Sequence, residues 1–249
     1  MTHDLNNIGP RVIVQFGDSG IYITETVIFG WIVAAVLILL ALWAAHNLQR
    51  IPKGKQVIAE FVVKSVYDLV INTMGKHCEK FAPYMGTLFL FLLLGNMLGL
   101  FGLRPTTDDV NMTFAMSGAT FLIIQYNGFK TMGFTGKLKH MADPYPFMFP
   151  LKLIEELSFP ISLSFRLFGN ILGGVIIMAL IFNGLHGLSE ALLGRIPFIG
   201  EIPWLQAVIP LPANAFFDIF EPVLQAFIFT MLTMVFVSMA VATHEDHEH

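Results

Sequence analysis

The chain has 249 residues, of which 55% are hydrophobic and 13% are charged, and its mean hydropathy is +0.69. A soluble globular domain carries about twice that charged fraction, so the composition excludes a water-soluble protein and predicts several membrane crossings. The net charge of −4, with no basic block away from the predicted spans, argues against a nucleic-acid partner. With Cys78 as the single cysteine, no intramolecular disulfide is expected, and neither a metal site nor a cofactor is predicted.

The predicted fold class is an all-α membrane protein that forms a single membrane domain over 1–249. A hydrocarbon core of about 30 Å needs roughly 20 helical residues to cross it. Five segments are long and apolar enough, and they are 24–46, 84–103, 112–128, 151–184 and 205–242. We expect 84–128 to form a helical hairpin. The polar residues 1–23 are predicted to be an N-terminal segment outside the membrane rather than a signal peptide, and 243–249 a solvated tail.

The basic residues predict the orientation of the spans. Ten of them lie in the connections after the first and third predicted spans, namely Arg50, Lys53, Lys55, Lys64, Lys76, Lys80, Lys130, Lys137, Lys139 and Lys152. Three lie on the opposite side, namely Arg11, Arg104 and Arg195. Lysine and arginine accumulate in cytoplasmic loops, so the N-terminus is expected outside and the C-terminus in the cytoplasm.

The connection over 54–80 has a helical pattern of its own. Ile58, Phe61, Val62, Val66, Leu69 and Val70 form an apolar stripe, and Glu60, Lys64 and Asp68 lie opposite it at i,i+4 spacing. This pattern predicts an amphipathic helix on the cytoplasmic surface. A connector packed on neighbouring spans would have the same pattern.

The last two predicted spans are longer than a bilayer requires. At about 1.5 Å per residue, 151–184 would reach roughly 50 Å and 213–242 roughly 45 Å. Such helices must tilt, kink or leave the membrane, and Pro160 could break the first of them. We therefore expect a pair of long, steeply tilted helices shaped to follow a curved neighbour.

Arg166 is a charge in the middle of an apolar span. Placing arginine at the centre of a membrane helix costs about 2.5–3.5 kcal/mol on translocon scales, and guanidinium cannot escape by losing its proton. Glu155, Ser162, Arg166 and Asn170 recur at helical spacing and share one stripe. Charged residues within a membrane are usually functional, although an ion pair that only fixes helix packing would also explain the stripe.

The final span carries a second polar patch. Asp218, Glu221 and Gln225 lie at positions i, i+3 and i+7 of an otherwise apolar helix. Two carboxyl groups close together at low dielectric cannot both ionise cheaply, so at least one is expected to hold a proton. This pattern predicts a proton relay beside Arg166. An acid pair that merely neutralises Arg166 remains the structural alternative.

Two motifs carry a resemblance to a known family. Residues 157–170, LSFPISLSFRLFGN, closely resemble a signature of subunit a of F-type ATP synthases, and residues 224–229, LQAFIF, resemble the family's second signature. The resemblance covers nearly the whole chain, and the pairing of these motifs is highly specific. Residues 149–156, FPLKLIEE, resemble those of bacterial members, which implies a bacterial and, more narrowly, an alphaproteobacterial source.

The resemblance implies roles for individual residues. The family's essential arginine falls on Arg166, its asparagine on Asn170 and its glutamine on Gln225, and the protonatable residue seven positions before that glutamine is Asp218. Relatives carry a Glu or His five positions after the asparagine, where this chain has Val175, so Glu221 is expected to take over that role. The acids near the cytoplasmic opening are expected among Glu155 and Glu156, with Ser162 on the same proton path.

The resemblance also implies a partner and a mechanism. The chain would be the stator of the membrane sector in the cell inner membrane, multi-pass, with a periplasmic N-terminus and a cytoplasmic C-terminus. Its partners would be the c-subunit ring, b-type peripheral stalk subunits, the F1 head, the lipid bilayer and protons. Two half-channels would carry protons to and from the ring carboxylates, so that the chain would translocate protons without hydrolysing ATP itself.

Two other classes of protein remain open at this stage. A proton-coupled secondary transporter would also bury charges, but usually in repeated units with broken helices, and no repeat is visible. A membrane scaffold would use the arginine and the acids only to set helix register. The tail over 243–249, THEDHEH, could bind a metal, although a solvated tail explains it as well.

Overall fold

The computed structural model describes residues 12–16, 21–142, 145–193 and 209–242. Within these ranges almost every element is a helix, and four helices are long and apolar enough to cross a membrane: Glu25–Ala45, Lys76–Phe101, Phe149–Leu188 and Pro210–Val241. The predicted all-α membrane fold is confirmed, but the count of five spans is not, because the helix that contains 112–128 is not among these four. The tail over 243–249 and the residues 1–11 and 205–208 of two predicted segments lie outside the described residues.

The N-terminal part contains strands that the sequence analysis did not predict. β1 (Val12–Phe16) and β2 (Ile21–Thr24) pair in antiparallel register, and α1 (Glu25–Ala45) follows directly. A helix of this length reaches about 31 Å, close to one bilayer crossing, and agrees with the predicted span 24–46. Most of its side chains are exposed in the chain, as expected for a helix surrounded by lipid.

The predicted surface helix ends earlier than expected. α2 (Lys55–Met74) stops at Gly75, whose φ of 85° is a left-handed conformation that favours glycine. A separate 3-10 helix, η2 (Lys76–Phe81), then leads into the next span. The prediction of one helix over 54–80 is therefore wrong at its C-terminal end. The last turns of α2 pack through Val70 and Met74 into a core shared with α8, whereas its first turns are exposed.

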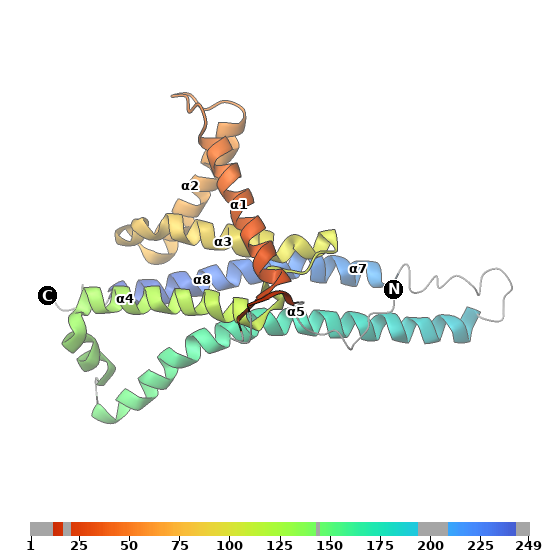
Figure 1. Cartoon of the computed structure of the whole chain (residues 1–249). Coiled ribbons are helices and arrows are strands. Elements are labelled where there is room, and N and C mark those ends of the chain that lie inside the picture. The colour runs from red at the N-terminus through yellow and green to blue at the C-terminus, as the bar shows by residue number, and fades with distance from the viewer. Residues whose placement is uncertain (1–11, 17–20, 143–144, 194–208, 243–249) are drawn as a thin grey trace.

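The two arms of the predicted hairpin over 84–128 touch through the hydroxyls of Tyr84 and Thr120, which lie 3.1 Å apart, but another helix also packs between parts of them. α3 (Ala82–Asn96) continues as η3 (Met97–Phe101), and after η4 (Thr106–Asp108) the chain returns as α4 (Val110–Ala142). The last helix of the chain, α8 (Glu221–Ala242), packs against both arms and lies between them in Figure 1. α4 also runs beyond the predicted end at 128, with a kink at Gly133 (φ 71°).

α5 (Phe149–Leu193), the first of the two long predicted helices, lies beside α4 and α8, and α1 runs across the direction of these helices (Figure 1). α5 follows η5 (Pro146–Met148) as one helix of 45 residues that includes Pro160. Pro160 therefore does not end the helix, which would reach about 68 Å if straight and is bent in Figure 1. On the other side of 194–208 the chain continues as α7 (Pro210–Ala215), η6 (Phe216–Phe220) and α8.

A buried polar cluster fastens α1 to the start of α4. The hydroxyls of Thr24 and Thr26 both donate to Asp109 Oδ2, at 3.0 and 3.1 Å, and the Asn111 backbone N–H donates to Asp109 Oδ1 at 2.9 Å. Asp109 is only 3% exposed, and these bonds compensate for its burial. The pKa of the neighbouring Asp108 carboxyl lies above its usual value, mainly because the group is partly buried. Arg104 lowers this pKa, and Asp109 raises it.

Candidate functional site

The face of α5 that carries Arg166 points away from the chain's own core. Glu155, Ser162, Arg166 and Asn170 are all exposed, and eleven positions separate Glu155 from Arg166, which is about three helical turns. To one side of this face, about 60° and 100° around the helix from Arg166, Leu163 and Leu167 are buried at 2% and 0%. The hydrophobic packing of these two leucines therefore sets the rotation of α5 and turns the guanidinium outward.

The leucines pack against the last helix. Leu163, Leu167, Ala226 and Phe229 belong to one buried cluster, which joins the middle of α5 to the middle of α8. Burying a leucine or phenylalanine side chain away from water contributes about 1.5–3 kcal/mol, but between helices in lipid the gain comes mainly from close van der Waals contact. This cluster holds the two polar motifs at fixed positions relative to each other.

A hydrogen bond joins the two motifs directly. Asn170 Nδ2 donates to Gln225 Oε1 at 2.9 Å. Gln225 is 5% exposed, and its Nε2 atom has no hydrogen-bond partner among the described residues. An unpaired buried amide donor costs about 1–3 kcal/mol, so this N–H group is available to a water molecule or an acceptor that reaches it.

Asp218 lies in a π-helical turn, which the sequence analysis did not predict. η6 (Phe216–Phe220) places the wider turn immediately before Glu221, whose backbone N–H donates to the carbonyl of Phe216. Such turns occur frequently at functional sites. Because a π turn advances less per residue than an α turn, it rotates Asp218 relative to the expected i, i+3, i+7 face. Asp218 and Glu221 are both half-buried.

Contacts between the antiparallel helices place the acids relative to Arg166. Asn170 meets Gln225, and a Cβ on Gly174 would lie 3.0 Å from Cδ1 of Phe217, one residue before Asp218. In the other direction, the rings of Phe159 and Phe236 lie 4.1 Å apart between centroids. The level of Asp218 is thus near Gly174, about 12 Å along α5 from Arg166.

Arg166 has no acidic partner within the described part of the chain. Its guanidinium makes neither an ion pair nor a hydrogen bond with any described residue. The expectation that the acids of the last helix lie beside it is not met, because the Asn170–Gln225 pair stands between them. The structure therefore disfavours the alternative in which Asp218 and Glu221 only neutralise Arg166.

The two cytoplasmic-side candidates, Glu155 and Glu156, have different surroundings. Glu156 Oε2 accepts a hydrogen bond from Gln125 Nε2 at 2.9 Å and lies 3.6 Å from Lys137 Nζ. Lys137, which is 6% exposed, also donates to Gln125 Oε1. Glu155 is exposed on the Arg166 face. The Gly133 kink brings Lys137 back to Gln125, and nothing in the local sequence indicates this contact.

The surface around Arg166 is apolar. The helices that meet at this site, α5, η6 and α8, carry several exposed large hydrophobic side chains, namely Ile161, Phe165, Phe220, Val223, Leu224 and Phe227. A single cation in such a surface is unfavourable in lipid alone. The arrangement fits an apolar partner that supplies a carboxylate.

Comparison with known proteins identifies the family. The family described as ATP synthase A chain matches residues 27–238. This chain belongs to that family. It is 32% identical over 245 residues to ATP synthase subunit a of Moorella thermoacetica, covering 98% of this chain and 100% of the relative. It is also 32% identical over 246 residues to the sodium-ion-specific subunit a of Propionigenium modestum, covering 91% of this chain and 78% of that relative.

The ATP synthase A chain match includes every candidate residue discussed above, from Glu155 to Gln225. A further relative, ATP synthase subunit a of Trichlorobacter lovleyi, is 33% identical over 218 residues, with 86% and 85% of the two chains covered. The predicted membership of subunit a is confirmed, whereas the alphaproteobacterial source and the roles of individual residues stay predictions. Among the described residues, no group of three or more His, Cys, Asp and Glu side chains could hold a metal ion.

Proposed function

We propose that this chain is the stationary, proton-conducting subunit in the membrane sector of an F-type ATP synthase. The observation that carries the proposal is the position of Arg166. It is exposed in an apolar surface, makes no ion pair within the described residues, and lies between acids on either side along the helix pair. Membership of the ATP synthase A chain family supports the same assignment.

The partner of the Arg166 face is a ring of c subunits that present one carboxylate each. The exposed phenylalanine, leucine and isoleucine side chains of α5, η6 and α8 would pack against the apolar helices of the ring. The guanidinium would meet each ring carboxylate in turn and favour its ionised form. The b-type peripheral stalk subunits and the F1 head complete the assembly of which this chain is the membrane stator.

Protons from the outer side reach the ring through Asp218, Glu221, Asn170 and Gln225. The two acids are half-buried at the level of Gly174, and the unpaired Nε2 donor of Gln225 beside Asn170 could hold a water molecule on this path. A proton passed from these groups neutralises the ring carboxylate, which can then rotate into lipid without the cost of a buried charge.

Protons leave on the cytoplasmic side near Glu155. This carboxyl group is exposed on the Arg166 face, about 16 Å along α5 from the arginine, with Ser162 between them. Glu156 is bound to Lys137 and Gln125, so we assign it the role of fastening α4 to α5. Arg166 separates the two routes and repels a proton that would otherwise pass directly between them.

The membrane potential drives this cycle. Each elementary charge that crosses 100 mV releases about 2.3 kcal/mol, and the path through the ring converts that energy to rotation. We place the chain in the cell inner membrane with a periplasmic N-terminus and a cytoplasmic C-terminus, because the basic residues concentrate near the ends of α1 and α4. Since α1 runs across α5 and α8 (Figure 1), these helices cannot all be parallel to the bilayer normal.

Purification of the intact complex tests the proposal. We expect a ring of c subunits, the stalk subunits and a soluble ATPase head to copurify with the tagged chain in mild detergent. In reconstituted vesicles, ATP should drive acidification in sodium-free buffer. A chain that purifies without a ring, or a complex that pumps only when sodium is present, would contradict the proposal and favour a transporter, a scaffold or a different coupling ion.

The neighbouring glutamates provide a matched pair for the cytoplasmic side. We expect Glu155→Gln to slow ATP-driven proton pumping several-fold while the melting temperature of the complex stays unchanged. Glu156→Gln should leave the pumping rate of assembled complexes nearly unchanged but lower the melting temperature, because removal of one partner leaves the largely buried Lys137 charge uncompensated.

The two variants are compared at equal amounts of assembled complex. A pumping defect in Glu156→Gln with normal pumping in Glu155→Gln would reverse the assignment of the two residues. It would leave the role of Arg166 untouched.

A further inference from the structure

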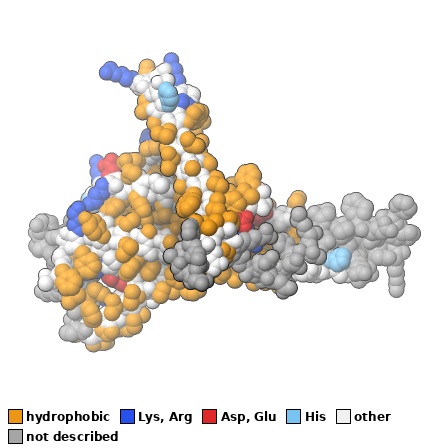
Figure 2. All heavy atoms as spheres, viewed as in Figure 1, with side chains coloured by type: hydrophobic (Ala, Val, Ile, Leu, Met, Phe, Trp, Pro, Cys, Tyr) orange, Lys and Arg blue, Asp and Glu red, His pale blue; other side chains and the backbone are white. Residues whose placement is uncertain are grey.

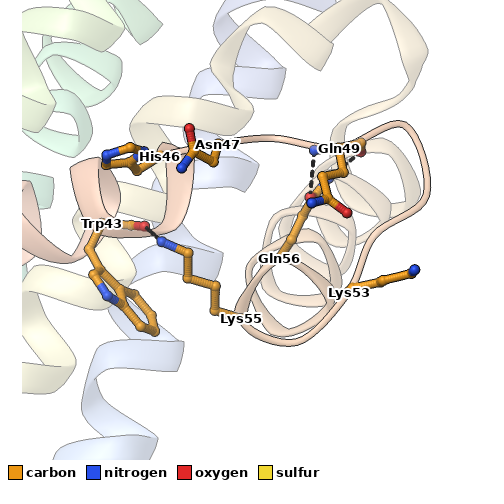
Figure 3. A pocket seen from close by; sticks show the side chains of 7 residues that line it. All are labelled: Trp43, His46, Asn47, Gln49, Lys53, Lys55 and Gln56. Atoms are coloured by element: carbon orange, nitrogen blue, oxygen red, sulfur yellow. Dashed lines mark hydrogen bonds between the residues drawn. The ribbon is translucent and has the colours of Figure 1, made fainter.

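The loop between α1 and α2, with the adjoining helix ends, lines an open basic cavity that the proposed function does not use. The cavity has a volume of about 530 Å³, within the range of about 300–1,000 Å³ that is usual for ligand sites. Figure 3 shows the side chains that line it, and they are Trp43, His46, Asn47, Gln49, Lys53, Lys55 and Gln56. None of the lining residues is acidic.

The shape of the loop is fixed by contacts that leave part of its basic charge available. The Gln49 backbone N–H donates to Gln56 Oε1 and Gln56 Nε2 donates to Gln49 O, both at 2.9 Å. Gln56 Nε2 also donates to Glu60 Oε1 at 2.7 Å, which holds this acid beside the cavity. Lys55 Nζ donates to the Trp43 carbonyl and lies 4.6 Å from the centroid of the indole ring. Lys53 is exposed, and in Figure 3 its ammonium group extends away from the loop.

The cavity lies where the apolar helix α1 ends, so it is at the boundary between hydrocarbon and water. Trp43 is 59% exposed there, and tryptophan is enriched at this depth. Basic side chains gather at the same tip of the molecule in Figure 2. Large apolar side chains beside the cavity are also exposed, namely Leu48, Ile51, Ile58 and Phe61.

From these features we infer that the cavity binds the phosphate headgroup of an anionic phospholipid. The ammonium groups of Lys53 and Lys55 and the side-chain amides of Asn47 and Gln49 complement the phosphate, and basic pockets near the ends of membrane helices recognise such headgroups. The exposed apolar side chains would contact the acyl chains, which neither free phosphate nor an acidic peptide possesses. The inference does not depend on the role proposed for Arg166.

Quenching of Trp43 by brominated lipids tests the inference in the full chain within its purified complex. Trp31→Phe and Trp204→Phe leave Trp43 as the chain's single tryptophan, and the same complex without Trp43 gives the background. Brominated phosphatidylglycerol should quench Trp43 more strongly than brominated phosphatidylcholine with the same acyl chains. Each lysine near the surface contributes about 1 kcal/mol, or roughly a five-fold preference.

Matched lysine variants separate the cavity from general surface charge. The pair Lys53→Gln and Lys55→Gln should remove the preference, and Lys53→Gln alone should reduce it about five-fold without disturbing the contacts of Lys55. The pair Lys64→Gln and Lys76→Gln, which removes two exposed charges elsewhere, should leave the preference unchanged. Added inorganic phosphate at constant ionic strength should not compete.

Three outcomes would overturn the inference. Competition by inorganic phosphate would mean a site for the free anion rather than for a lipid. An equal loss of preference in both lysine pairs would mean a diffuse surface effect. Protection of Trp43 from both brominated lipids would mean that another protein subunit covers the cavity.

Discussion

Arg166→Ala is expected to abolish ATP-driven proton pumping while the ATPase activity of the detached head stays normal. Without the guanidinium, the stretch of α5 from Glu155 to Asn170 carries no cation that would favour the ionised form of an approaching ring carboxylate. The positive barrier between the acids on either side of Arg166 is lost as well. We therefore expect pumping to fall to background and the passive proton conductance of head-stripped vesicles to rise.

Arg166→Lys is the matched control, because it keeps the charge but loses the planar fork of the guanidinium. If this variant still blocks the passive proton leak but pumps poorly, the positive charge alone prevents the leak. The planar shape of the guanidinium would then be needed to couple proton transfer to rotation. Both variants should assemble with the ring, since Leu163 and Leu167 rather than Arg166 hold α5 against α8. Normal coupling in Arg166→Ala would contradict the role.

The sequence predicted the α5 face correctly because the pattern there is strong and periodic. An arginine inside an apolar run can be placed by helical spacing alone, and Leu163 and Leu167 fall to one side of its face. The Asn170–Gln225 contact could not be derived from spacing, because it joins two helices 55 positions apart in the chain. Only the resemblance to subunit a placed those residues in one site.

Other parts of the structure have no periodic signal in the sequence. The π turn at Phe216–Phe220 changes the face of Asp218 without any proline or glycine inside it. The fold-back at Gly133 brings Lys137 to Glu156, and a single glycine does not reveal a left-handed conformation. α8 packs against both α3 and α4, and the sequence does not indicate this because long-range packing determines which helices are neighbours.

The exposure of charged side chains also distinguishes residues that face a partner from residues that only hold helices together. Asp109 is buried and accepts hydrogen bonds from Thr24, Thr26 and the Asn111 backbone, as expected for a carboxylate that only fastens helices. Arg166 and Glu155 are exposed on one face with apolar neighbours. A polar group in that setting lowers its energy only when a partner or water arrives.

The pair of changes Asp218→Asn and Glu221→Gln is expected to reduce proton flux without preventing assembly. The amides are close in size to the acids but cannot pass a proton on. Since a positioned acid or base speeds proton transfer by about 100-fold or more, we expect at least a roughly ten-fold decrease in pumping, with water partly replacing the lost groups. The measurement is the initial rate of ATP-driven acidification per assembled complex.

The control is Asp68→Asn with Glu79→Gln, which removes two exposed acids from α2 and η2 and should leave the rate unchanged. The single variants then separate the two site acids. Asp218 lies inside the π turn and Glu221 begins α8, so the larger defect identifies the group closer to the ring carboxylate. Unchanged flux in the double variant would mean that both acids only support the packing of η6 against α5, and that protons reach the ring by another route.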